Sequence, residues 1–302
     1  MLYPLLFNSI RHPKIWGEEV WTLCESSTIV NGFLESNTLQ EIVEVYLDEL
    51  LGQHVFAQYN TYFPLLFKII DAREDLSVQV HPDDAFAEAN GLTNGKTEMW
   101  YIISESPDAS VILGWNDRQT ESSLRHHIET GSLMTALRSF NVKKADVVYI
   151  PAGTVHTLQR HTKVIEIQQN SDTTYRLYDY NRTNERGEQR PLHIEEAIRC
   201  CNKDIDARPP FSCPDKKNEV SLMEDRHFVT RRVIIKKKTT CNYSDYDSFV
   251  ALICLEGGLD IVYEDMHLQI KPYEHVLIPA CVDDITLSPS DLIGSFLEVH
   301  VP

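Results

Sequence analysis

Two segments of the chain read alike: Asp146-Val-Val-Tyr-Ile-Pro-Ala-Gly-Thr-Val-His156 and Glu274-His-Val-Leu-Ile-Pro-Ala-Cys-Val-Asp-Asp284. In an alignment without gaps, Pro151 matches Pro279 and His156 falls opposite Asp284. Such an echo predicts a repeated β domain whose second copy has lost the histidine. A match this short also arises by chance, and the sequence alone does not decide between the two origins.

The sequence between and around these segments has the pattern of a β protein. Short apolar runs of strand length, separated by turn residues, occur at 67–70, 77–80, 98–103, 111–113, 147–150 and 164–167, and the pattern resumes from Phe228 to the end. Many short strands of this kind indicate a sandwich or a barrel. We therefore expect a mainly β fold.

A few helices interrupt the strands. Apolar residues recur at helical spacing over 39–51, with acidic residues on the other side. A second helix is expected over 121–140 and a third over 194–199. The stretch 204–218 is rich in Pro, Lys and Asp and has the composition of a linker. These boundaries predict a first domain at 1–203, a linker at 204–218 and a second domain at 219–302.

Size and charge narrow the class of protein. With 302 residues, 42% of them hydrophobic, the chain can bury a core and fold alone. Its 28 basic and 45 acidic residues give a net charge of −17. A field of that sign repels phosphate backbones and acidic headgroups, so we expect no nucleic-acid or membrane partner.

The cysteines and the N-terminus predict the compartment. The seven cysteines are odd in number and contain no Cys-x-x-Cys pair, which fits free thiols in a reducing compartment. The apolar start of the chain is soon interrupted by Arg11, His12 and Lys14, and no apolar run reaches membrane-spanning length. We expect a cytoplasmic, soluble protein.

Polar side chains recur on one face of successive strands. Because strand side chains alternate, Ser77, Gln79 and His81 share a face. For one strand alone, a face turned to solvent would account for this pattern. Lys96 with Glu98, and then Glu166 with Gln168, repeat the alternation on two further strands. Three such strands favour a common polar cavity.

A fourth element adds a second imidazole to the cavity. His156 ends a Pro-x-Gly-x-x-His turn, in which Pro151 and Gly153 fix the backbone. Two imidazoles, a carboxylate and an amide suit a catalytic divalent metal with an open position. The remaining histidines lack matching partners and are expected to be structural, among them His54, His126, His127, His161, His193 and His227.

The Pro-x-Gly-x-x-His turn and the Gln-x-His element resemble the two motifs of the cupin superfamily. The first cupin motif usually reads His-x-His, whereas Gln79 holds the first position here. That departure points away from cupin dioxygenases and towards one branch of the superfamily.

Within that branch the chain resembles the type I mannose-6-phosphate isomerases in their shorter bacterial form. The resemblance covers nearly all of the chain and rests on five segments, namely Lys14-Ile-Trp-Gly17, Leu76-Ser-Val-Gln-Val-His-Pro-Asp-Asp84, Gly95-Lys-Thr-Glu-Met-Trp-Tyr101, the turn at Pro151 and Gln169-Asn-Ser-Asp-Thr-Thr-Tyr-Arg-Leu-Tyr-Asp-Tyr-Asn-Arg182.

The resemblance implies a fold and a ligand set. It implies two cupin-type (jelly-roll) β-barrels, with a few helices inserted in and flanking the N-terminal one. It implies one Zn²⁺ per chain, although the same donors also suit Co, Mn or Fe. Family zinc ligands fall on Gln79, His81, Glu98 and His156. No metal is expected in the second domain, where Asp284 stands at the ligand position.

The resemblance also implies an activity, the interconversion of mannose 6-phosphate and fructose 6-phosphate through a cis-enediol(ate). The catalytic arginine of the family falls on Arg176, and the residues that hold the sugar phosphate fall on Lys96 and Ser77. Glu166 and Asp172 lie in motif positions and, with a metal-bound water, are the candidates for proton transfer. The partner is a small sugar phosphate, and the chain is expected to be a monomer or a homodimer.

Two competing functions remain compatible with the same residues. An Fe(II)-dependent cupin oxygenase also uses two histidines and a carboxylate. A sugar-phosphate-binding protein without activity would keep the pocket. For Arg176 alone, a salt bridge to Asp172 or Asp179 would account for the residue without any catalytic role.

Overall fold

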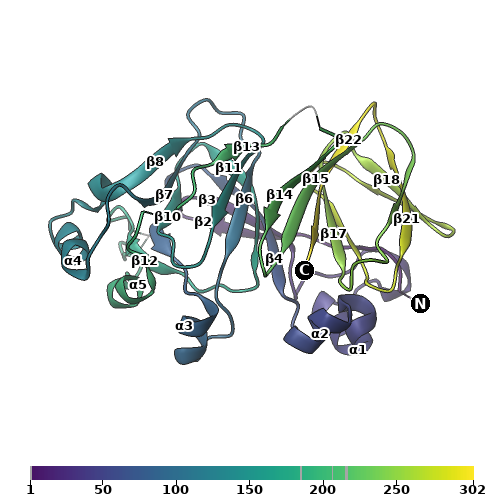
Figure 1. Cartoon of the computed structure of the whole chain (residues 1–302), viewed down its shortest axis with the longest axis horizontal. Coiled ribbons are helices and arrows are strands. Elements are labelled where there is room, and N and C mark those ends of the chain that lie inside the picture. The colour runs from purple at the N-terminus through teal and green to yellow at the C-terminus, as the bar shows by residue number, and fades with distance from the viewer. Residues whose placement is uncertain (1, 184–185, 206, 215–216) are drawn as a thin grey trace. The chain divides into compact units, whose positions relative to one another are not determined.

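The computed structural model describes residues 2–183, 186–205, 207–214 and 217–302, and these are mainly β (Figure 1). The strand pairs run antiparallel, and five α-helices occur among the described residues. The expected fold class is thus confirmed at this level. No helix in these ranges has the length and apolar character needed to cross a membrane.

The chain divides into two compact units. The first, called the central unit, comprises Arg11–Val20 and Leu66–Ser212. The second, called the terminal unit, comprises Met1–Ile10, Trp21–Leu65 and Cys213–Pro302. Residues 21–65 therefore group with the C-terminal strands, a grouping that the sequence pattern did not predict.

The central unit contains two antiparallel sheets. One has the order β13-β9-β6-β11-β4-β3-β2. Its strands are β2 (Ile10–Lys14), β3 (Gly17–Leu23), β4 (Leu65–Ala72), β6 (Glu98–Ile102), β9 (Asp146–Ile150), β11 (Thr162–Gln169) and β13 (Phe211–Ser212). The other has the order β12-β5-β10-β7-β8. Its strands are β5 (Val78–Val80), β7 (Ser110–Trp115), β8 (Leu137–Asn141), β10 (His156–Leu158) and β12 (Tyr175–Tyr178).

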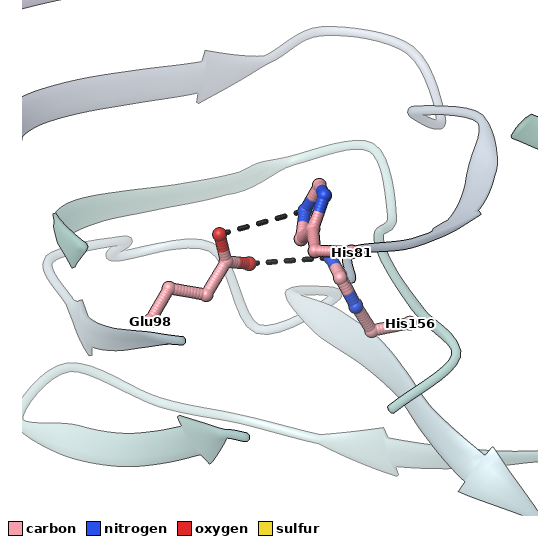
Figure 2. Close-up of side chains that lie close together, drawn as sticks. All are labelled: His81, Glu98 and His156. Carbon is pink, nitrogen blue, oxygen red and sulfur yellow. Dashed lines mark ion pairs between the residues drawn. The ribbon is translucent and has the colours of Figure 1, made fainter. Parts of the chain in front are cut away.

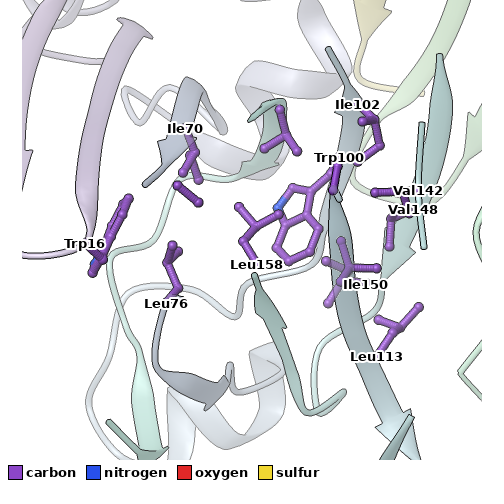
Figure 3. Close-up of a cluster of buried hydrophobic side chains, with 14 of the residues drawn as sticks. Trp16, Ile70, Leu76, Trp100, Ile102, Leu113, Val142, Val148, Ile150 and Leu158 are labelled. Carbon is purple, nitrogen blue, oxygen red and sulfur yellow. The ribbon is translucent and has the colours of Figure 1, made fainter. Parts of the chain in front are cut away.

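A hydrophobic core lies between these two sheets. Trp100 and Val148 from the larger sheet pack in one buried cluster with Leu113 and Leu158 from the smaller sheet (Figure 3). Ala207, from the stretch expected to be a linker, joins the same cluster. The inner faces of both sheets are therefore turned toward each other.

Helices cover the outer face of the smaller sheet. The helices of the central unit are α3 (Asp84–Ala89), α4 (Glu121–Glu129) and α5 (Ile194–Cys200), the last of which confirms the helix predicted over 194–199. Val78 and Val80 of β5 pack against Leu124 of α4 and Ala197 of α5. Since side chains alternate along a strand, Gln79 must point to the inner face.

The predicted helix over 121–140 was wrong in its second half. α4 ends at Glu129, a 3-10 turn follows at Leu133–Ala136, and Leu137 begins strand β8. Gly131, with a φ of +69°, ends the helical path. Leu137 then pairs with Trp115, so tertiary pairing overrides the helical spacing of the leucines.

The terminal unit also contains two sheets with a core between them. The larger, in the order β1-β20-β17-β22-β15-β14, consists of β1 (Leu5–Leu6), β14 (Glu219–Glu224), β15 (Val229–Ile235), β17 (Val250–Glu256), β20 (His275–Ile278) and β22 (Gly294–His300). The smaller, in the order β16-β21-β18-β19, consists of β16 (Thr239–Asn242), β18 (Leu259–Tyr263), β19 (Met266–Ile270) and β21 (Asp284–Pro289). Leu252 and Phe296 pack with Ile261 and Leu287 across the core.

Two helices belong to the terminal unit, α1 (Leu39–Leu51) and α2 (Gln53–Tyr59). The predicted helical segment over 39–51 is confirmed, with a kink at Leu47 (φ +49°), and it starts at a capping box formed by Thr38 and Glu41. At its end, Gly52 adopts a φ of +92°, and a Cβ there would lie 2.2 Å from the Asp247 carbonyl oxygen. Only glycine fits this junction without strain.

The strand orders of the two units repeat. The run β9-β6-β11-β4 corresponds to β20-β17-β22-β15, and β5-β10-β7-β8 corresponds to β16-β21-β18-β19. The residues that precede the two prolines also pair alike, Ile150 with Glu98 and Ile278 with Val250. The two similar sequence segments therefore lie at corresponding places in the two units.

The structure corrects one position of that echo. His156 is buried at the inner end of β10, whereas Asp284 is exposed and the next residue, Ile285, packs in the terminal core. The structural counterpart of His156 is therefore Ile285, one residue beyond the position that the gapless alignment gave. The counterpart of Glu98 is Val250, so both positions are apolar in the terminal unit.

Candidate metal centre

Three ligand-type side chains converge at one end of the central core. His81 follows β5, Glu98 begins β6 and His156 begins β10. The Nε2 atom of His156 lies 3.2 Å from Glu98 Oε1, and Nε2 of His81 lies 3.6 Å from Glu98 Oε2 (Figure 2). None of the three residues is more than 1% exposed.

Backbone carbonyls fix the orientation of both imidazoles. Nδ1 of His81 lies 2.8 Å from the Thr173 carbonyl oxygen, and Nδ1 of His156 lies 2.8 Å from that of Thr154. A carbonyl oxygen can only accept, so each Nδ1 carries the proton. The Nε2 lone pairs are left pointing toward Glu98, as in histidines that bind a metal.

The surroundings favour an ionised Glu98 carboxylate and a neutral His81 imidazole. Burial opposes ionisation of Glu98, but Lys96 and the two histidines outweigh it and hold its pKa well below the ordinary value. Burial, followed by the charge of Lys96, lowers the pKa of His81 well below its ordinary value. Ligands must be in these protonation states to bind a cation.

The residues therefore fit a divalent metal. His81 Nε2 and both carboxylate oxygens of Glu98 are buried without a hydrogen bond, and one donor atom from each of the three residues lies within 4.8 Å of the others. Buried donors and acceptors without hydrogen bonds are costly in a folded protein unless something else binds them.

Gln79 lies beside this group. Its amide Nε2 is 3.4 Å from His156 Nε2, and its Oε1 accepts from Ser77 Oγ at 3.2 Å. Rotation of the amide by half a turn would point the oxygen at the ligand group instead, since the two ends of an amide have the same shape. Gln79 can thus supply a fourth ligand without moving the backbone.

Lys96 completes the chain of contacts. Its ammonium lies 3.3 Å from Glu98 Oε2, and only 4% of the residue is exposed. Six of the residues expected from the sequence are thus brought together, namely Ser77, Gln79, His81, Lys96, Glu98 and His156.

Glu166 lies next to this group. Its Oε2 accepts from the Trp100 indole at 2.7 Å, and its Oε1 lies 3.1 Å from the Lys68 ammonium. The Trp100 ring meets the His156 ring edge-on at 5.5 Å. Glu166 is therefore connected to the ligand group through the side chain of Trp100.

Lys68 was not predicted from the sequence. It is buried on β4, and Glu166, with help from Glu19 and Glu98, outweighs the effect of burial and raises its pKa. The sequence feature that could have revealed it is a lysine within the apolar run of β4 (Leu65–Ala72). A lysine buried in such a strand needs an anionic partner.

Arg176 faces the same site. It is paired with Gln79 across β12 and β5, so the two side chains share a face. Its Nε is buried without a hydrogen bond. Burial, followed by the charge of Arg190, lowers its pKa. Among the described residues, no ion pair joins Arg176 to Asp172 or Asp179, so a structural salt bridge does not account for this arginine.

Asp172 is less closely connected. Its side chain is exposed, and the contacts of the described residues do not join it to the ligand group. It precedes Thr173, whose carbonyl oxygen orients His81. Its expected role in proton transfer therefore has less support than that of Glu166.

The arrangement can stabilise negative charge on a small substrate. Arg176 has a guanidinium without an anionic partner among the described side chains, and Lys96 and Lys68 add two further cations to a chain of net charge −17. Fixed cations in a buried site stabilise a developing oxyanion more strongly than cations in water.

Comparison with known proteins agrees with this geometry. Residues 9–108 match the family described as "Phosphomannose isomerase type I, catalytic domain". The chain is 37% identical to the mannose-6-phosphate isomerase of Streptococcus mutans serotype c, over 92% of this chain and 93% of that one. It is 40% identical to the mannose-6-phosphate isomerase ManA of Bacillus subtilis (strain 168), over 65% of this chain and 67% of that one.

The fold is shared as well. The crystal structure of the mannose 6-phosphate isomerase from Bacillus subtilis superposes with a TM-score of 0.86 at 28% identity, covering 99% of this chain and all of that one. Sequence and fold thus agree over nearly the whole length. The chain belongs to the type I phosphomannose isomerase family.

Proposed function

We propose that this protein interconverts mannose 6-phosphate and fructose 6-phosphate by proton transfer through a cis-enediol(ate). The observation that carries the proposal is the buried His81–Glu98–His156 group, in which His81 Nε2 and both Glu98 oxygens lack hydrogen bonds, beside Arg176, whose Nε also lacks one. The reaction removes a proton next to a carbonyl, and negative charge develops on oxygen. The site is suited to that charge.

Zinc is the proposed cofactor, one ion per chain, held by Gln79, His81, Glu98 and His156. A mannose 6-phosphate isomerase of the same fold, at a TM-score of 0.75, has been solved with zinc bound. When bound, the metal would act as a Lewis acid toward the substrate oxygens. The same donors also suit Co, Mn or Fe.

The polar residues around the ligand group receive distinct roles. Arg176 stabilises the developing oxyanion, because its charge is fixed and uncommitted. Lys96 and Ser77 hold the sugar phosphate. Glu166 transfers the proton, and Asp172 is the alternative for this step. The contact of Glu166 with Lys68 keeps a proton donor beside that carboxylate.

The finer description of the fold is also part of the proposal. The repeated strand order supports two cupin-type jelly-roll barrels, the second without metal ligands. Within the predicted domain at 1–203, the catalytic part would be the central unit (Arg11–Val20 and Leu66–Ser212), and the predicted second domain at 219–302 would be completed by the N-terminal segments of the terminal unit. All seven cysteines are free thiols, which supports a reducing, cytoplasmic location. The chain would act as a monomer or a homodimer.

Two measurements test the function. A coupled assay should detect fructose 6-phosphate formed from mannose 6-phosphate, and elemental analysis should find zinc. Oxygen uptake with bound iron would instead indicate a cupin oxygenase. Sugar-phosphate binding without turnover, in a zinc-loaded protein, would indicate a binding protein.

A further inference from the structure

Asp179 binds two arginines at once. It lies just beyond β12 and is 5% exposed. Its Oδ1 accepts from Nη2 of Arg182 and Nη2 of Arg190, and its Oδ2 accepts from Nε of Arg190 at 2.8 Å. Both oxygens of this carboxylate are therefore engaged.

The chain turns sharply at this carboxylate. The amide of Arg182 donates to the Asp179 carbonyl oxygen at 3.1 Å, closing a four-residue turn. The two central residues, Tyr180 and Asn181, have φ values of +56° and +53°. A left-handed conformation is unfavourable for a bulky residue such as tyrosine and persists only where the surroundings enforce it.

Arg182 enforces the turn. Its guanidinium donates to Asp179 and to the carbonyl oxygen of Asp75, and it lies over the Tyr180 ring at 5.1 Å. The strained backbone is thus held by a charge-assisted contact.

The other side of Arg176 is also tethered. The amide of His193 donates to the Arg176 carbonyl oxygen at 2.9 Å, and the Arg176 amide donates to His193 Nδ1 at 3.3 Å. His193 precedes α5, and Arg190 lies three residues before it. The backbone of Arg176 is therefore fixed both through the Asp179 turn and through His193.

These contacts leave the Arg176 side chain uncommitted. Asp179, three residues away, is the natural ion-pair partner of Arg176 in sequence, but Arg182 and Arg190 occupy it. The Arg176 guanidinium shares the inner face with Gln79. The half-buried Arg176 cation, whose Nε lacks a hydrogen bond, is thus available to an anionic substrate on that face.

We propose that Asp179 is a positioning residue for the reaction. By binding Arg182 and Arg190, it holds the strained turn after β12 and keeps the Arg176 guanidinium free for the oxyanion that forms in the transition state. The proposal rests on the proposed function, because it assigns Arg176 a transition-state role. Asp179 itself does not touch the substrate.

The test compares Asp179→Asn with Asp179→Glu in the zinc-loaded protein. We expect Asp179→Asn to lower kcat about tenfold or more, since small misplacements of a catalytic group have effects of this size. KM should stay within about twofold and zinc content should be unchanged, because ground-state binding does not depend on the aim of Arg176. Asp179→Glu keeps the carboxylate and should recover most of the lost kcat.

A matched control is Asp247→Asn. Asp247 likewise accepts hydrogen bonds from two residues, the backbone amides of Gln53 and His54, but it lies in the terminal unit. We expect its kcat to equal that of the wild type. If Asp179→Asn retained kcat within about threefold, or if Asp179→Glu lost as much as Asp179→Asn, the positioning role would be overturned.

A spectroscopic measurement separates this proposal from the proposed function. In ¹⁵N-arginine-labelled protein, the Nε–H signal of Arg176 can be assigned by its loss in Arg176→Lys. We expect the signal to shift or broaden in Asp179→Asn and to return in Asp179→Glu. An inactive wild type would reject the isomerase function, whereas an unchanged Arg176 signal in Asp179→Asn would reject the positioning role alone. The spectrum also reports whether each variant is folded.

Discussion

Arg176 and Gln79 lie directly opposite each other on neighbouring antiparallel strands. The pairing places a guanidinium and a proposed metal ligand on one face, with side chains about 5 Å apart at Cβ. The residue proposed to stabilise charge and the residue proposed to bind the cation are therefore aligned by strand pairing, and their separation does not depend on a flexible loop.

Replacing Arg176 with Ala should separate catalysis from folding. We expect kcat to fall about 100-fold or more, because a charge aimed at the oxyanion is lost. The melting temperature and the zinc content should stay close to those of the wild type. Arg160→Ala, which removes an exposed arginine of the same unit, is the control. Near-wild-type turnover of Arg176→Ala would remove this residue from the mechanism.

The histidines should decide metal content. His81→Ala or His156→Ala removes one of the buried nitrogens that face Glu98. We expect bound zinc, measured by elemental analysis after gel filtration, to fall from about one per chain to a small fraction of that value. His126→Ala alters an exposed histidine outside the group and should keep its zinc. Undiminished zinc in both ligand variants would contradict the ligand set.

The Lys68–Glu166 pair should be important for stability. Lys68→Met leaves the Glu166 carboxylate buried without its cation, so we expect the free energy of unfolding to fall by about 3–5 kcal/mol. The double variant Lys68→Met with Glu166→Gln should recover part of this loss, since no unpaired charge remains. Denaturant unfolding of the single and double variants measures the coupling. Additive losses in the double variant would show that the two side chains do not interact.

The free energy of unfolding should decrease on acidification, because His275 is buried in its neutral form. Burial lowers the pKa of His275 from 6.5 to about 4. Between these values the unfolded chain binds a proton that the folded chain does not, so stability falls as the pH drops from about 6.5 toward 4. The full difference corresponds to about 3 kcal/mol. Unfolding free energies at pH 7 and pH 5 should therefore differ less in His275→Phe than in the wild type.

The local sequence pattern was sufficient to predict those features that depend on local backbone geometry. The alternation at Ser77, Gln79 and His81 correctly predicted a polar inner face, because strand geometry fixes the direction of each side chain. The helix at 39–51 was predicted at its observed bounds from its apolar spacing, and the structure adds a capping box at its start. The repeat of this alternation on three strands predicted a common polar cavity, whereas the proposed ligand set came from the family resemblance.

Long-range pairing accounts for the failures. The leucine spacing over 121–140 gave no sign that Leu137 would pair with Trp115 in a sheet. The one-residue offset between Asp284 and Ile285 depends on strand register, which the short Ile-Pro-Ala match cannot specify. The saturation of Asp179 by Arg182 and Arg190 likewise depends on how the chain folds back after β12.

The two units also repeat an interior ion pair. Glu166 is paired with Trp100 across its ladder, and Glu298 is paired with Leu252 at the corresponding position. Glu166 contacts Lys68, and Glu298 contacts Arg231. The terminal unit therefore has an acid–base pair at the corresponding position, but Val250 and Ile285 where the central unit has Glu98 and His156. The terminal unit thus offers the same backbone positions without ligands, and Val250→Glu with Ile285→His would be the starting point for designing a metal site there.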